Sequence, residues 1–261
     1  IGLGIPAEPL FRSRDDISLL MMERINLDLN GQLDMAISIF KNEYPKHFLH
    51  QLISSQLDVD RMDYLCRDSF FTGVQEGRVA SERLLKMLDV RNDRLVVQVK
   101  GIYSVEKFLV ARRLMYWQVY LHKTSVAAEQ HLIKILSRAK ELAHEGKDLF
   151  CSPSLRYFLY QHVTFERFST TSEALEQYAL LDDNDVLSAI KAWIASDDKV
   201  LSLLSRSFIN RHLFRGELLN APLTEEQKTA LNKQYAAVLG VTEKDAEYLW
   251  SENVSTRNTI S

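Results

Sequence analysis

Arg112, Tyr116 and Tyr120 follow one another at intervals of four residues, which places them on one face of a helix. Lys123 returns to the same face, and His122 lies near its edge. An arginine gives phosphate a bidentate fork, a lysine gives it a point charge, and a tyrosine or histidine ring can stack or form hydrogen bonds. This spacing therefore favours nucleotide binding, although core or interface tyrosines beside a solvated arginine are an alternative.

A second stretch, residues 50–73, reads HQLISSQLDVDRMDYLCRDSFFTG and concentrates acids, bases and a tyrosine on what we expect to be one short helix. Its polar arc comprises Asp60, Arg61, Tyr64, Arg67 and Asp68. Its apolar arc, which we expect to face the core, comprises Val59, Met62, Leu65 and Cys66. Gly73 predicts the helix end, with Phe70 and Phe71 packed against the core. A solvated face with intrahelical pairs such as Asp63 with Arg67 remains the alternative.

Residues 57–74, LDVDRMDYLCRDSFFTGV, resemble the downstream D-[RK]-x-D-Y motif of HD-domain phosphohydrolases, particularly deoxynucleoside triphosphate triphosphohydrolases. Residues 111–123, ARRLMYWQVYLHK, resemble the R-x(7)-Y-x-H-K segment of the same family. The resemblance implies that Asp60 is the last ligand of a metal centre. It also implies that the substrate is contacted by Arg61, Tyr64, Asp68, Arg112, Tyr120, His122 and Lys123. The helical spacing adds Tyr116 to this set of contacts.

The chain departs from the family pattern because it contains no His-Asp dipeptide, which family members need together with an upstream histidine. We interpret His47 and His50 as structural, and one carboxylate cannot hold a catalytic transition metal. We therefore expect a divalent cation (Mn, Fe, Mg, Ni or Zn) only if the missing ligands belong to a longer protein. The start at Ile1 rather than Met suggests such a protein, and the chain alone is expected to be inactive.

Two other types of site are disfavoured. DVDRMD is not an EF-hand loop, because Met62 occupies an oxygen-ligand position and Asp63 occupies the position of the glycine. Cys66 is on an apolar face without a histidine neighbour, so it is not a candidate nucleophile. Cys66 and Cys151 are 85 positions apart and are expected to be free thiols in the core.

The remaining sequence is typical of a helical protein. Helical periodicity, caps and terminal glycines predict helices throughout, and residues 92–101 (NDRLVVQVKG) are the best strand candidate. We predict a mainly α fold, an HD-domain-like helical bundle with one or two short strands and a helical C-terminal lobe. We place the HD-like part, which includes the nucleotide-contact helices, at residues 1–145 and the lobe at 146–261.

Composition excludes some classes of function. A net charge of −3 among 261 residues gives no strong nucleic-acid signature, and no apolar run approaches the length of a membrane span. A soluble, cytoplasmic protein is expected, and the family resemblance adds a homo-oligomer. The sequence thus favours a metal-dependent phosphohydrolase acting on nucleotides, particularly deoxynucleoside triphosphates. A non-catalytic nucleotide-binding regulatory or oligomeric module is the alternative, and an unrelated helical scaffold is a third interpretation.

Overall fold

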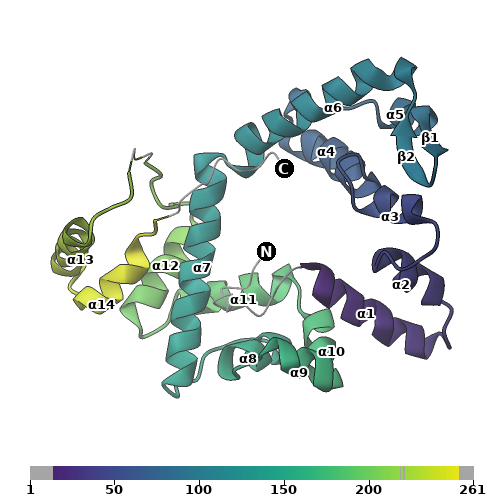
Figure 1. Ribbon diagram of the computed structural model, residues 1–261. Coiled ribbons are helices and arrows are strands. Elements are labelled where there is room, and N and C mark those ends of the chain that lie inside the picture. The colour runs from purple at the N-terminus through teal and green to yellow at the C-terminus, as the bar shows by residue number, and fades with distance from the viewer. Residues whose placement is uncertain (1–13, 218, 220, 253–261) are drawn as a thin grey trace. The chain divides into compact units, whose positions relative to one another are not determined.

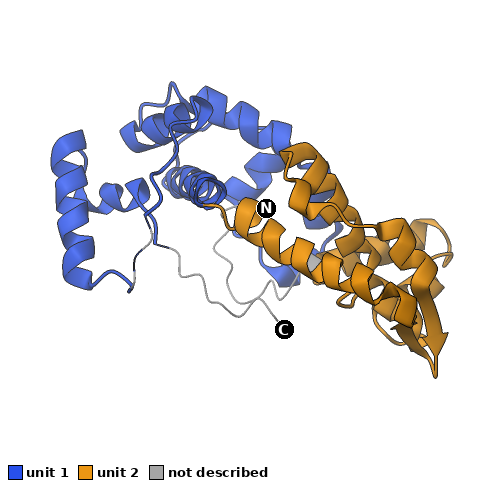
Figure 2. Ribbon diagram, turned by 90° about the horizontal axis from the view of Figure 1, so that it is seen from above, with its two compact units in different colours: residues 1–11, 123–261 blue, residues 12–122 orange. Residues whose placement is uncertain are grey.

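The computed structural model describes residues 14–217, 219 and 221–252, and the chain divides into two compact units (Figure 2). The described part of unit 2 is residues 14–122, and that of unit 1 begins at Lys123. The units divide after His122, whereas the sequence placed a domain boundary at 145. The glycines and prolines of the opening segment predict irregular structure over residues 1–14, and residues 1–13 of it lie outside the described residues. The mainly α prediction is confirmed.

Unit 2 is a set of short helices with one hairpin (Figure 1). Its elements are α1 (Arg14–Asp28), α2 (Asp34–Phe40), α3 (His47–Ile53), α4 (Val59–Thr72), η1 (Gln75–Gly77), α5 (Ser81–Met87), β1 (Leu88–Arg91), β2 (Arg94–Val97), η2 (Val99–Gly101), α6 (Ile102–Met115) and the π-helical η3 (Tyr116–Tyr120). α4, α5 and α6 share the core of this unit. Its buried members are Met62, Leu65, Leu84, Phe108 and Met115.

The predicted strand pairs with a segment that the sequence analysis did not identify as a strand. β1 and β2 are antiparallel, with Leu88 opposite Val97 and Arg91 opposite Arg94. Asn92 and Asp93 form the two-residue turn, with φ values of 50° and 58°. Positive φ at both turn residues matches the right-handed twist of a hairpin, and Asn and Asp tolerate it better than most residues.

The expectation of one helix through residues 50–73 is wrong. α3 ends at Ile53, and α4 begins at Val59 after the N-cap residue Asp58. Met62 and Leu65 are buried as predicted, but Val59 is 43% exposed. Phe70 and Phe71 are also exposed, because they and Val59 occupy the end turns of α4 while the core contacts its middle. Gly73 ends the helix with φ 74°, as predicted.

The sequence also predicts one long helix over residues 104–124 that starts from a Ser104 cap, and the structure differs from this prediction. α6 begins at Ile102, so Ser104 lies inside it rather than capping it. After α6 the chain widens into η3, where the Leu121 N–H donates to the Tyr116 carbonyl at 2.7 Å, the i→i+5 bond of a π-helix. A new helix, α7, begins at Lys123.

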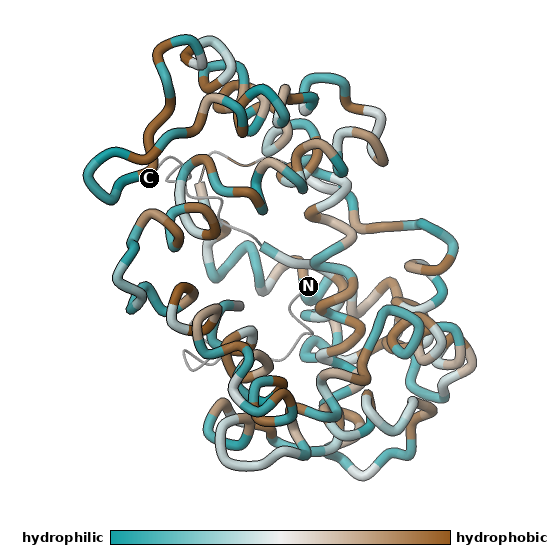
Figure 3. Tube along the Cα trace, turned by 90° about the vertical axis from the view of Figure 1, so that its right-hand side faces the viewer, coloured by the Kyte–Doolittle hydropathy of each residue, from teal (hydrophilic) through white to brown (hydrophobic). Residues whose placement is uncertain are grey.

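The described part of unit 1 is helical. Its elements are α7 (Lys123–His144), α8 (Pro153–Tyr160), α9 (Phe165–Thr170), α10 (Ser172–Leu180), α11 (Asp183–Trp193), α12 (Lys199–Ile209), α13 (Glu225–Leu239), α14 (Glu243–Ala246) and η4 (Glu247–Leu249). Hydrophobic and hydrophilic residues alternate along the chain trace (Figure 3). In unit 1, the apolar sides of α7, α8, α11 and α12 meet in one core. Asp182 and Thr224 form the capping boxes of α11 and α13, and Gly240 ends α13 with φ 59°.

Cys66 and Cys151 are both free, as predicted, although each is half-buried rather than fully buried in a core. Among the described helices, none has both the length and the apolar character needed to cross a lipid bilayer.

Candidate functional site

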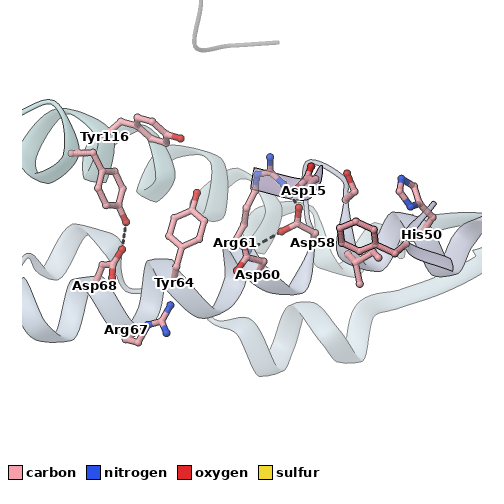
Figure 4. Close-up of a pocket in the computed structure, with 13 residues that line it drawn as sticks. Asp15, His50, Asp58, Asp60, Arg61, Tyr64, Arg67, Asp68 and Tyr116 are labelled. Atoms are coloured by element: carbon pink, nitrogen blue, oxygen red, sulfur yellow. Dashed lines mark hydrogen bonds and ion pairs between the residues drawn. The ribbon is translucent and has the colours of Figure 1, made fainter. Parts of the chain in front are cut away.

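The polar face of α4 borders a pocket of about 670 Å³ that lies within unit 2 (Figure 4). Its walls come from α1 to α4 and from η3. The lining residues are Asp15, Phe40, His50, Ile53, Ser54, Asp58, Asp60, Arg61, Tyr64, Arg67, Asp68, Tyr116 and Tyr120. Six of the nine residues predicted to be metal or substrate contacts therefore lie around one cavity. They are Asp60, Arg61, Tyr64, Asp68, Tyr116 and Tyr120.

Asp58 organises the N-terminal end of this pocket, and the sequence analysis did not single it out. It is 2% exposed, and as the N-cap of α4 it accepts the Arg61 N–H at 2.7 Å. It also accepts the Ser55 N–H at 3.2 Å and an ion pair from the Arg61 guanidinium. Arg61 Nη1 donates in addition to the Ser55 carbonyl at 2.6 Å. Arg61 is thus oriented beside the pocket before any ligand binds.

Three tyrosines line the other end. The Tyr120 hydroxyl donates to Asp68 Oδ2 at 2.5 Å. The ring centroid of Tyr120 lies 5.2 Å from that of Tyr116 and 6.1 Å from that of Tyr64, both in edge-to-face geometry. Tyr116 and Tyr120 are the end residues of η3, so the π-helical turn sets the positions of both rings. The result is a wall of aromatic rings and one carboxylate (Figure 4).

The environment keeps the phenols of Tyr120 and Tyr64 neutral. Partial burial raises the pKa of Tyr120, and its hydrogen bond to Asp68 and the Asp68 charge raise it further. Partial burial and Tyr116 raise the pKa of Tyr64, and this is partly offset by Arg112 and Arg61. Both side chains therefore remain hydrogen-bond donors throughout the physiological pH range.

Replacing Tyr120 by phenylalanine is expected to lower the free energy of unfolding by about 1–2 kcal/mol, because Asp68 loses a charge-assisted hydrogen bond in a partly exposed site. Urea unfolding would measure the change. Tyr44→Phe, which removes a phenol hydroxyl elsewhere in unit 2, is the matched control and should change stability less. Equal effects of the two substitutions would contradict a specific role for the Tyr120–Asp68 bond.

Arg112, His122 and Lys123 do not line the cavity. Arg112 lies beside it, donating from Nη1 to the Gln56 side chain at 3.0 Å, with its guanidinium carbon 5.8 Å from the Tyr116 ring centroid. The helical segment α6–η3, which contains Arg112, ends at Tyr120, and a separate helix, α7, starts at Lys123. The prediction that Lys123 shares a helix face with Arg112 is therefore wrong. Substrate contact by His122 and Lys123 stays a prediction from the resemblance.

The described residues do not by themselves fit the metal that the resemblance implies. Asp60 lines the pocket and is exposed, but in the part of the chain that the structure describes no three His, Cys, Asp or Glu side chains form a group that could hold a metal ion. Asp58 is engaged in capping α4. His50 also lines the pocket, with its Nδ1 lying 3.0 Å from the Ile39 carbonyl oxygen.

Comparison with known proteins gives matches over most of the chain. Residues 79–151 match the family described as HD associated region. A crystal structure of a phosphohydrolase from Bacteroides thetaiotaomicron superimposes with a TM-score of 0.86 and 56% identity, covering 88% of this chain and 57% of that one. YwfO from Bacillus subtilis is 41% identical, over 70% of this chain and 40% of that protein.

A putative HD domain-containing protein of Acanthamoeba polyphaga mimivirus is 21% identical, over 82% of this chain and 43% of that protein. The chain thus spans about half the length of the proteins it matches. These comparisons relate residues 79–151 to the HD associated region and most of the chain to part of a phosphohydrolase structure.

Proposed function

We propose that the protein is a phosphohydrolase acting on nucleotides, with deoxynucleoside triphosphates as its substrates, and that the pocket of unit 2 binds the phosphates and the nucleoside. The observation that carries the proposal is the meeting of Arg61, Asp68 and three tyrosines around one cavity of about 670 Å³. This volume falls within the range of small-molecule sites. The structural similarity to a phosphohydrolase supports the reaction class.

The side chains of the pocket divide naturally between the parts of a nucleotide. Arg61 has one guanidinium nitrogen engaged by Asp58 and Ser55, and its remaining N–H groups can donate to phosphate oxygens. Asp68 can accept a hydrogen bond from a sugar hydroxyl, and the rings of Tyr64 and Tyr116 offer apolar faces to sugar or base. Binding and orientation are the steps assigned to these residues.

The proposal includes a divalent metal, which would supply Lewis-acid chemistry at the phosphates when bound. Asp60 would contribute one carboxylate ligand. Because the described residues do not complete such a site, its other ligands must come from elsewhere in the protein.

The activity is tested with the protein expressed from its complete gene. Each of the four deoxynucleoside triphosphates is incubated with Mn²⁺, Fe²⁺ or Mg²⁺, and the products are separated by ion-exchange chromatography. Release of inorganic tripolyphosphate and a deoxynucleoside supports the proposal. Saturable nucleotide binding without turnover in any metal would instead favour a non-catalytic nucleotide-binding module.

Asp60→Ala is expected to reduce both turnover and the amount of metal retained after gel filtration, because a carboxylate ligand is removed. Asp63→Ala is the matched control, since Asp63 lies on the same helix but forms an exposed ion pair with Arg67 at 3.1 Å and does not line the pocket. Unchanged turnover and metal content in Asp60→Ala would remove Asp60 from the metal site.

A further inference from the structure

One face of α6 is apolar and exposed, although the opposite face of the helix already contributes to the core of unit 2. Phe108, Ala111 and Met115 point inward and are completely buried. On the outside, Tyr103 and Val110 of α6 are 79% and 53% exposed, and Trp117, which follows in η3, is 64% exposed. A helix that is apolar on opposite sides is expected to be covered on both of them.

The outward residues form a regular stripe. Tyr103, Val110 and Trp117 are spaced seven residues apart, and exposed Glu106 and Arg113 fall between them. At about 100° per residue, the five positions lie within roughly 80° of the helix circumference. Arg113 also packs over the Trp117 ring, with its guanidinium carbon 5.2 Å from the ring centroid. Heptad spacing of this kind is the pattern by which one helix packs along another.

The order of these residues is self-complementary under a two-fold rotation. Val110 lies at the centre, with an acid and then a tyrosine on its N-terminal side and a base and then a tryptophan on its C-terminal side. A second copy of α6, antiparallel and related by a two-fold axis at Val110, brings Glu106 of each copy towards Arg113 of the other. Tyr103 then meets Trp117. A two-fold interface requires this self-complementarity, and opposite charges set its register.

We propose that this stripe, comprising Tyr103, Glu106, Val110, Arg113 and Trp117, is the interface through which two copies of the protein associate. The central contact is Val110 on Val110, and two Glu106–Arg113 ion pairs flank it. Because the stripe and the pocket are on the same helical segment, α6–η3, pairing would also brace the η3 turn that positions Tyr116 and Tyr120.

The charge order gives a sharp test by sedimentation equilibrium of the full-length protein. Glu106→Arg and Arg113→Glu should each weaken self-association at least about tenfold, because each places like charges opposite one another twice. An equimolar mixture of the two variants should restore association, since every facing pair is then opposite in sign. Glu82→Arg, an equal charge change at an exposed position of α5, should associate like the wild type.

Three results would overturn the proposal. They are a wild-type protein that stays monomeric, single variants that associate normally, and a mixture that does not recover association. A stripe covered by a different protein or by another part of the same chain would give the last result, because mixing two copies cannot repair such a contact. Far-ultraviolet circular dichroism of each variant confirms that the fold is intact.

Discussion

Replacing Arg61 by methionine is expected to reduce kcat/KM for deoxynucleoside triphosphate hydrolysis by about 10²–10³-fold, the usual effect of removing one preorganised donor from a charged transition state. The Arg61 guanidinium is fixed by the Ser55 carbonyl at 2.6 Å and by the Asp58 carboxylate. The protein has therefore already ordered this long side chain, and its charge is available to phosphate without a further entropy cost.

Arg78→Met is the control for this substitution. Arg78 is exposed, its Nη1 lies 3.4 Å from the Gln75 side chain, and it does not line the pocket. Arg61→Lys keeps the charge but loses the planar fork, so its kcat/KM should lie between those of the wild type and Arg61→Met. Steady-state kinetics should be accompanied by melting curves, because Asp58 loses a partner. Equal losses in Arg61→Met and Arg78→Met would contradict a phosphate-binding role for Arg61.

The largest expected loss of stability is in unit 1, where Arg138 is the centre of a buried ion network. It binds Asp198 through Nε and Nη2, at 3.2 and 2.6 Å. Its Nη1 contacts Glu141 at 2.6 Å and Asp245 at 3.0 Å. Only 9% of the side chain is exposed. Arg138→Met leaves three carboxylates facing one another, and it should lower the free energy of unfolding by about 3–5 kcal/mol.

The network also predicts a pH dependence of stability. Partial burial alone would raise the pKa of Asp198, but hydrogen bonds from Arg138 and from the Leu201 N–H hold it below its ordinary value of 3.8. Partial burial alone would also raise the pKa of Glu141. Hydrogen bonds from Lys244, Arg138 and Tyr248 outweigh this effect and hold the pKa of Glu141 below its ordinary value of 4.5. Carboxyls with lowered pKa stabilise the fold above their ordinary pKa, and this stability is lost as the pH falls through the lowered values.

Urea unfolding at several pH values measures both effects. Wild-type stability should fall below about pH 4.5, and Arg138→Met should show a smaller dependence in that range, because the groups that lower the two pKa values include Arg138. Arg156→Met removes an exposed ion pair with Asp148 and should change stability much less than Arg138→Met does, because water screens the pair. A cost for Arg138→Met as small as that for Arg156→Met would show that the network does not stabilise unit 1.

Periodicity and family motifs anticipated much of the pocket, since Asp60, Arg61, Tyr64 and Asp68 all line it. Asp58 was missed because residues 50–73 were treated as one helix. The sequence does carry a signal for the break, because Ser54, Ser55 and Asp58 are residues that favour turns and N-caps. Asp15 and His50 line the pocket from α1 and α3. Their positions depend on packing between helices, which spacing along one helix does not encode.

The π-helical turn could not be predicted either. No glycine or proline occurs between Arg112 and Lys123, so the sequence offers no local signal for a helix break. The turn brings the Tyr120 hydroxyl to Asp68, a residue 52 positions earlier in the chain. Such a long-range contact compensates for the poorer geometry of a π-helix only in the folded protein. The sequence analysis therefore did not predict that the helical segment ends at Tyr120. For the same reason it did not predict that Lys123 lies on a different helix from Arg112.

Photo-cross-linking tests most directly whether the unit 2 pocket binds nucleotide. The full-length protein is irradiated with an 8-azido deoxyadenosine triphosphate, with and without excess unmodified dATP, and the labelled peptides are identified by mass spectrometry. The proposed function predicts labelling, suppressed by dATP, within residues 59–72 or 112–120. Labelling that dATP does not suppress, or labelling confined to residues 123–252, would contradict it.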